Sequence, residues 1–149
     1  MNFKLDTNTV EKIAKLSYLA GIIDGEGSIG IEHLSPTKGR PKSYYVCRLT
    51  VINTNKNLME LLLHFFGGSY NQRKKIEKRK ICYRWHIFGE NLEKTLDQLI
   101  PYLFIKKQQA LIVKQYRETV GKTGWNVTNE VLNKRKELWL QCKELNKLG

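Results

Sequence analysis

The carboxylate of Glu26 stands near the end of a run of mostly small and apolar residues from Leu19 to Gly27, two residues after Asp24. Within this run Gly21 and Gly25 are four residues apart, so on a helix they share one face, where a second helix backbone can approach closely. The run is too short to span a bilayer, so the partner of this face should be protein. A carboxylate at a helix–helix seam in a very basic chain predicts that a metal ion and a phosphodiester meet there.

The chain carries far more positive than negative charge, and the excess is concentrated. Its 149 residues have a formal net charge of +12, with 41% hydrophobic and 27% charged residues. The segment from Arg73 to Arg84 holds seven lysines and arginines against one acidic residue, Glu77. Charge arranged in this way favours a polyanionic partner, and we expect a nucleic acid in preference to an anionic membrane or a merely solvated face.

The cysteines and the N-terminus indicate the compartment. Cys47, Cys82 and Cys142 are odd in number and far apart, and the histidines do not fall at zinc-ligand spacing. We therefore expect neither a structural zinc nor a disulfide framework, which fits a reducing environment. Met1–Val10 has no apolar signal core, and no later segment is long enough to cross a membrane. We expect a soluble, intracellular protein of the cytoplasm, the nucleoid or an organelle matrix, without a membrane partner.

The periodicity of apolar residues predicts an α+β fold of order α-β-β-α-β-β-α with a further helix behind it. Expected helices are 9–25, with Thr9 as N-cap, then 57–66, 91–100, 106–120 and 128–148; expected strands are 28–34, 44–53, 69–75 and 80–88. Two hairpins make one four-stranded antiparallel sheet with helices on one face. We expect one domain over residues 1–149, with a core at about 9–121 and a C-terminal helical extension at about 125–149.

The residues from Leu19 to Gly27 resemble the signature of the LAGLIDADG homing endonucleases. Ile22 replaces a leucine, Glu26 replaces an aspartate, and Gly25 takes a position commonly held by alanine or glycine. The chain holds one such motif, so it looks like the single-motif, homodimeric type. The resemblance implies a homing endonuclease that cuts double-stranded DNA at a long pseudopalindromic site, uses Mg²⁺ or another divalent cation such as Mn²⁺, and serves the mobility of an intron.

The same resemblance implies roles for individual residues. Glu26 would hold the metal ion with the backbone carbonyl of Gly25, the alternative being that Glu26 only caps a surface turn. Lys106 would stabilise the phosphate or organise water, and Lys107 is the alternative lysine. Asn55, after the second strand, would position the attacking water, unless it serves the turn in which it lies.

One chain supplies one such carboxylate, whereas a duplex has two strands to cut. A two-fold homodimer would bring two Glu26 side chains together and join two sheets into one surface, which predicts a near-palindromic target. The residues expected at the dimer interface are Ala20, Gly21, Asp24 and Gly25, with Asp24 also available to hydrogen-bond backbone at the seam.

The exposed face of the sheet is expected to read DNA in the major groove, because every second strand residue points toward it. The candidate DNA-binding residues are Glu32, Tyr44, Arg48 and Thr50 in the first hairpin, Lys38, Arg40 and Lys42 at its tip, and Gln72, Lys74, Arg84 and His86 in the second hairpin. The register of the last strand stays open: Tyr83, Trp85 and Ile87 have the character of core residues, but a slip by one residue would exchange the two faces.

Two other interpretations remain for this sequence. An RNA maturase that helps its intron to fold would use the same basic surface on intron RNA. A sequence-specific DNA-binding protein that has lost cleavage would keep the sheet but not need Glu26. A basic structural protein would leave the motif at Leu19–Gly27 unexplained.

Overall fold

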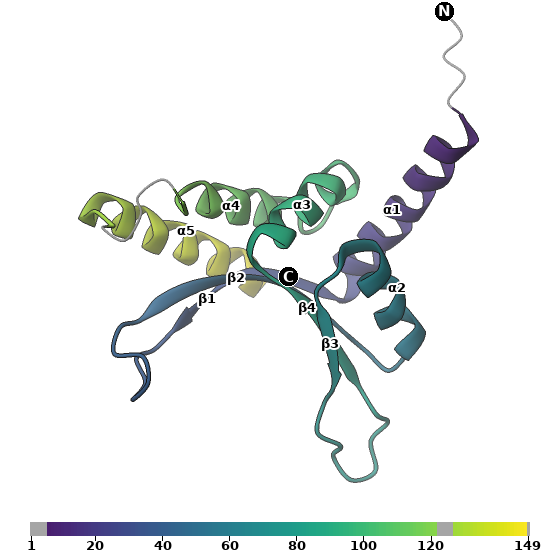
Figure 1. The fold of residues 1–149 in the computed structure, drawn as a ribbon, viewed down its shortest axis with the longest axis horizontal. Coiled ribbons are helices and arrows are strands. Elements are labelled where there is room, and N and C mark those ends of the chain that lie inside the picture. Colours follow the sequence, from purple (N-terminus) through teal and green to yellow (C-terminus); the bar gives the residue numbers. More distant parts are fainter. Residues whose placement is uncertain (1–5, 122–126, 149) are drawn as a thin grey trace, which may run out of the picture.

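The computed structural model describes residues 6–121 and 127–148 and has the expected α+β architecture. The strands are β1 (Gly27–Leu34), β2 (Tyr44–Asn53), β3 (Ser69–Gln72) and β4 (Tyr83–Ile87), which pair in antiparallel fashion in the order β1-β2-β4-β3. The helices are α1 (Thr7–Glu26), α2 (Lys56–Phe66), α3 (Gly89–Leu99), α4 (Lys107–Glu118) and α5 (Asn129–Leu148), with a 3₁₀ turn η1 (Ile100–Tyr102) after α3. Figure 1 shows the helices gathered on one side of a curved sheet, from which the two hairpin arms extend away.

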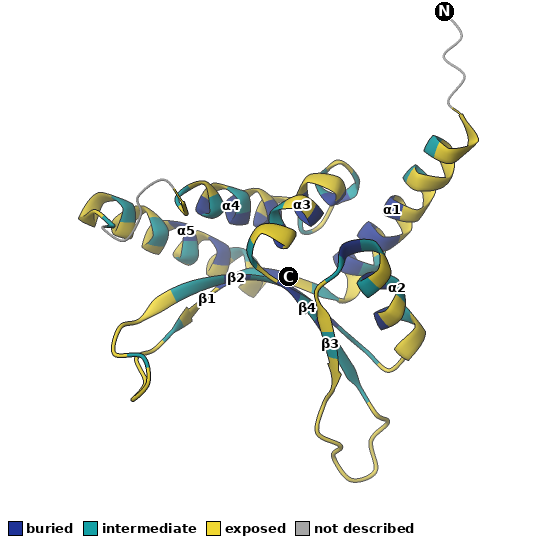
Figure 2. Cartoon of the chain, in the orientation of Figure 1, coloured by how far each residue is buried: buried dark blue, intermediate teal, exposed yellow. Residues whose placement is uncertain are grey.

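The register of β4 settles which face of the sheet forms the core. Trp85 lies opposite Val51 and is fully buried. Ile87, two residues later, is only 1% exposed. Arg84 and His86 therefore point to the other face, away from the helices. Figure 2 shows the buried residues where the helices meet the sheet, whereas the ends of the hairpin arms are exposed. The structure thereby settles the register of the last strand, which the sequence left open.

Several element boundaries differ from the prediction by one to three residues, and two of these differences concern residues named above. Asp6, not Thr9, is the N-cap of α1, because the Asp6 carboxylate accepts a hydrogen bond from the Thr9 backbone N–H at 2.8 Å. The prediction of Thr9 was wrong because both residue types are good caps and the helix simply begins earlier. Strand β3 ends at Gln72, before the predicted end at residue 75, so Lys74 lies in the connection between β3 and β4.

Helix α5 packs against β1, one of the two edge strands of the sheet. Leu138 and Cys142 are its buried residues, and the Asn146 side-chain amide donates a hydrogen bond to the Ile29 carbonyl at 3.2 Å. Because β1 is an edge strand, its outward carbonyls would otherwise be open to pairing with another chain. The extension predicted from residue 125 includes residues 125, 126 and 149, which lie outside the described residues.

The described ranges hold no helix long and apolar enough to cross a membrane. Residues 1–5 of the segment expected to lack a signal core lie outside the description. Cys47, Cys82 and Cys142 are free thiols. Burial raises the pKa of Cys47 to about 12, so this thiol stays protonated and unreactive at neutral pH.

We expect Gly68→Ala to destabilise the fold. Gly68 follows α2 with φ +79°, and a Cβ there would lie 2.5 Å from the His86 carbonyl oxygen. The left-handed backbone and this clash together should lower the free energy of unfolding by about 2–4 kcal/mol. Urea denaturation measures the change, with Gly39→Ala as the control because a Cβ at Gly39 meets nothing within 4 Å. Equal stability of the two variants would contradict the prediction.

Candidate functional site

The last turn of α1 is tied to the start of α4 by one buried carboxylate. Asp24 accepts hydrogen bonds from the backbone N–H groups of Phe104 at 2.8 Å and Lys106 at 2.9 Å, one on each carboxylate oxygen. Only 8% of Asp24 is exposed. These bonds join segments about eighty residues apart in sequence, and they fix where the chain enters α4.

The same junction brings Lys106 to the tip of α1. Its ammonium group donates a hydrogen bond to the backbone carbonyl of Asp24, two residues before Glu26. A cation at a helix C-terminus is favourable because the carbonyl groups point outward there. Lys107 instead begins α4 and is exposed. Of the two lysines, the described contacts place Lys106 beside the α1 tip.

Glu26 is the last residue of α1, it is exposed, and its carboxylate is contacted by Asn53. The Asn53 side-chain amide donates a hydrogen bond to the Glu26 carboxylate, while the Asn53 side-chain oxygen accepts one from the Asn55 backbone N–H at 2.8 Å. The second bond fixes the amide orientation, so its NH₂ group faces Glu26.

Asn55 lies elsewhere and has a local role. It is the N-cap of α2, where its side-chain oxygen accepts the Asn57 backbone N–H at 2.9 Å. The structure thus shows the local role for Asn55, that of a helix cap, whereas Asn53 is the asparagine that contacts Glu26. The pairing of Gly27 with Val51 carries β2 past the start of β1, which puts Asn53 next to the end of α1. The sequence patterns did not predict the strand register that brings Asn53 to this position.

The donor groups at this tip suit a hard divalent cation. Among the described residues no three His, Cys, Asp or Glu side chains come together as a closed metal cage. Mg²⁺ is usually held by one or two carboxylates together with water and substrate phosphate rather than by a closed cage. The exposed Glu26 carboxylate, beside the outward carbonyls of a helix C-terminus, offers this open set of oxygen ligands.

One face of α1 is open to a partner. Gly21 and Gly25 are exposed, and a Cβ at either position would meet nothing within 4 Å. Ala20 and Asp24 instead are buried within the chain, at 0% and 8% exposure. Their expected place on the dimer interface was wrong, because their side of α1 packs against the chain's own elements. What distinguishes Gly21 and Gly25 from Ala20 and Asp24 is their position around the axis of the helix.

The sheet face opposite the helices, here called the open face, carries most of the residues predicted to read DNA. It is formed by alternate strand residues, and a shallow hollow of about 220 Å³ on it is lined by Ser28, Glu32, Arg48, Thr50, Asn71, Arg84 and His86. Tyr44 shares the parity of Arg48 and Thr50 on β2. Of the predicted residues, Glu32, Arg48, Thr50, Arg84 and His86 line this hollow, and Tyr44 lies on the same face by parity alone; that they contact DNA stays a prediction.

Gln72 does not belong to the open face. It lies opposite Tyr83 and has the parity of Tyr70, which packs toward the helices, so its predicted placement was wrong. Asn71 and Ser69 lie opposite Arg84 and His86 and take its place. Strand β3 is short, and its sequence does not alternate clearly between apolar and polar residues, so only the pairing with β4 decides its parity.

Charge on the open face is unevenly paired. Arg48 forms an ion pair with Glu32 at 3.3 Å, whereas Arg84 has no acidic partner among the described residues. Partial burial, together with the positive charges of Arg48 and Arg84, lowers the pKa of His86 below its ordinary value. His86 is therefore neutral at neutral pH, and its ring accepts or donates hydrogen bonds without adding charge.

The hairpin tips carry the remaining predicted residues. Lys38 and Lys42 are exposed in the connection between β1 and β2, and Lys74 is exposed in the connection between β3 and β4. Arg40 has a structural part as well: its guanidinium lies 4.2 Å from the centre of the Tyr44 ring and donates to the Ser35 carbonyl at 2.8 Å. These contacts of Arg40 stabilise the tip of the first hairpin.

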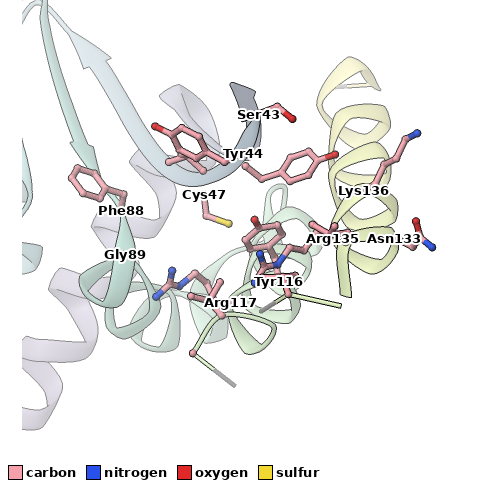
Figure 3. A pocket seen from close by; sticks show the side chains of 16 residues that line it. Ser43, Tyr44, Cys47, Phe88, Gly89, Tyr116, Arg117, Asn133, Arg135 and Lys136 are labelled. Atoms are coloured by element: carbon pink, nitrogen blue, oxygen red, sulfur yellow. The ribbon is translucent and has the colours of Figure 1, made fainter. Parts of the chain in front are cut away.

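A second hollow, of about 650 Å³, lies between the first residues of β2 and the helices α4 and α5 (Figure 3). Its arginines are already engaged: Arg117 pairs with Glu93 at 3.1 Å, and Arg135 donates to the Thr119 carbonyl and hydroxyl at 2.9 Å. Residues 122–126, which adjoin this hollow in sequence, lie outside the described residues. We assign no function to it.

Comparison with known proteins identifies the family. Residues 19–115 match the family model described as LAGLIDADG endonuclease. The chain belongs to the LAGLIDADG endonuclease family. A curated relative, the DNA endonuclease I-CvuI of Chlorella vulgaris, is 30% identical over 103 residues, which are 68% of this chain and 62% of that protein. The match thus spans less than two thirds of the relative's length.

Solved structures of other LAGLIDADG proteins share the fold. I-CvuI in complex with a target DNA has a TM-score of 0.75 and 25% identity, covering 91% of this chain and 83% of that chain. I-SmaMI bound to cleaved DNA has a TM-score of 0.64 and 26% identity, covering 92% of this chain and 43% of that chain. The archaeal I-Vdi141I, at 17% identity and a TM-score of 0.69 over 93% of this chain and 86% of that chain, shares the fold.

We expect Asp24→Asn to weaken the junction between α1 and α4. The amide has one acceptor oxygen and cannot accept both the Phe104 and Lys106 N–H groups, so one buried donor loses its partner. The free energy of unfolding should fall by about 1–3 kcal/mol, measured by urea denaturation. Asp97→Asn, which removes only an exposed pairing with Lys114, is the control and should cost at most about 1 kcal/mol. Equal losses of unfolding free energy in the two variants would contradict this prediction.

Proposed function

We propose that this chain is a site-specific homing endonuclease that cuts both strands of a long pseudopalindromic DNA target as a homodimer, with a divalent cation, Mg²⁺ or Mn²⁺, as cofactor. The observation that carries the proposal is the convergence of Glu26, Asn53 and Lys106 at one helix tip at the end of the open face. We further propose that residues 9–121 form the catalytic core of one domain over residues 1–149, with α5 as its extension.

In this proposal each residue at the tip has a distinct task. Glu26 holds the cation with the Gly25 carbonyl, and the cation supplies charge neutralisation at the phosphate and activation of water. Asn53 keeps the Glu26 carboxylate in place. The Lys106 ammonium has three N–H donors and uses one on Asp24, so donors remain for the phosphate as its charge develops.

Double-stranded DNA as substrate is supported by the surface that adjoins this tip. The open face offers hydrogen-bonding side chains on strands, a form that enters the major groove, while the exposed lysines gather at the hairpin tips. Such lysines neutralise phosphates on either side of the bases that the sheet reads. Relatives of similar fold, I-CvuI and I-SmaMI, were solved bound to DNA.

A homodimer is supported by what the chain leaves uncovered. Gly21 and Gly25 present a flat strip on α1, and large apolar side chains stand exposed on the same helix and beside its tip, among them Tyr18 at 62%, Phe104 at 90% and Ile105 at 67%. Exposed apolar side chains around a close-approach face are typical of an interface. This chain also covers only 43% of I-SmaMI, so that longer chain has room for a second unit of this size.

The test of catalysis is cleavage of a plasmid library of candidate sites with Mg²⁺. The wild-type protein should cut a discrete site, chelation of the metal should abolish cutting, and Glu26→Gln should lower the rate by roughly 10³-fold, because the neutral amide is a poor ligand. Asn53→Ala should lower it by roughly 10- to 100-fold through loss of the group that orients Glu26.

DNA binding by the same variants is the control, measured by gel shift, and it should change little. Tight binding without cutting by the wild-type protein would overturn the nuclease and favour the DNA-binding protein without cleavage. Stronger binding to intron RNA than to any duplex would favour the maturase.

Gly21→Phe should break the dimer and abolish double-strand cutting. Space around Gly21 is open within the chain, so the monomer should fold, but the ring would stand between two closely packed helices. We expect the dimer to weaken by roughly 100-fold, about 3 kcal/mol of overpacking, in sedimentation equilibrium. Asn8→Phe, at the exposed start of α1, is the matched control. A Gly21→Phe protein that still sediments as a dimer would place the interface elsewhere.

A further inference from the structure

The open face holds a carboxylate, a group that the negative charge of DNA should repel. Among the described strand residues of this face, Glu32 is the only acidic one, and its side chain is 49% exposed. DNA phosphates offer no hydrogen-bond donor to a carboxylate. In the major groove the donors on base edges are the amino groups of cytosine and adenine, so a base is the DNA group that Glu32 can bind favourably.

Glu32 does not stand alone. It forms an ion pair with Arg48 of the neighbouring strand, between Glu32 Oε2 and Arg48 Nη1 at 3.3 Å. Gly30, with no side chain, lies directly opposite Arg48, so the guanidinium reaches along β1 to Glu32 instead. An ion pair this exposed contributes about 0–1 kcal/mol to stability, so the fold does not depend on it.

The two side chains together present a fixed hydrogen-bonding pattern to a ligand. The guanidinium offers donors only, and the carboxylate offers acceptors only, so the pair reads donor, donor, acceptor across the strands. A G·C pair shows the complementary order in the major groove, with the N7 and O6 acceptors of guanine followed by the N4 donor of cytosine. An A·T pair alternates acceptor, donor, acceptor and does not match.

We propose that Glu32 and Arg48 act as one unit that selects a single G·C base pair in each half of the target. The inference rests on the proposed function, since it assumes that the open face lies in the major groove. Arg84 differs from Arg48 in having no acidic partner among the described residues, so it selects no cytosine and contacts its own position independently.

The experiment selects bound sequences from duplex DNA with a randomised half-site. Glu26→Gln is the parent, so that bound DNA stays uncut, and Arg48→Met, Glu32→Gln and Arg84→Met are added to it singly. The parent should enrich G·C in one column of the half-site. Arg48→Met and Glu32→Gln should both relax that same column, by roughly 10- to 100-fold for Arg48, because each removes part of one pattern.

Arg84→Met is the matched control and should leave that column unchanged. The inference is overturned if Glu32→Gln and Arg48→Met alter different columns, or if both weaken all sequences alike with a shallower salt dependence, as phosphate contacts do. Failure of the proposed function is seen separately: a wild-type protein that binds the selected site without cutting it overturns the nuclease alone, whereas a parent that enriches no sequence overturns both.

Discussion

The hydrogen bonds of Asp24 are the constraint on which the rest of the site depends. A carboxylate that is nearly buried must find donors, and here it finds the backbone N–H groups of Phe104 and Lys106. Because both donors are main-chain groups, the bonds fix the path of the chain and not merely one side chain. Helix α1 therefore ends at a set position against the start of α4, and Lys106 is delivered to the tip that carries Glu26.

The second constraint is the parity of the sheet. Trp85 and Ile87 are buried under the helices, and the alternation of strand side chains then commits Arg84 and His86 to the open face. Core formation and the composition of the open face are consequences of one register, so a slip that spoiled the core would also move Arg84 and His86 off the open face. The overhang of β2 beyond β1 follows from the same register and puts Asn53 beside Glu26.

The electrostatics of the α1 tip differ from those of the chain as a whole. The net charge is +12, yet Glu26 adds a carboxylate to a helix end where carbonyl oxygens already point outward. Lys106 offsets part of this local negative charge through the Asp24 carbonyl. A small oxygen-rich tip within a strongly basic surface is an arrangement in which a cation and a phosphate are both attracted, each by its own group.

The sequence by itself determined the element order, the tip position of Glu26 and the family, because these depend on short-range periodicity and on a contiguous motif. It also singled out Lys106, through local resemblance. Tertiary structure alone decided that Asn53 and not Asn55 contacts Glu26, that Asn71 and not Gln72 lies on the open face, and that Ala20 and Asp24 turn inward while Gly21 and Gly25 stay open. Each of these depends on strand register or on helical phase relative to distant segments, and contacts between residues far apart in the chain leave no pattern in either segment alone.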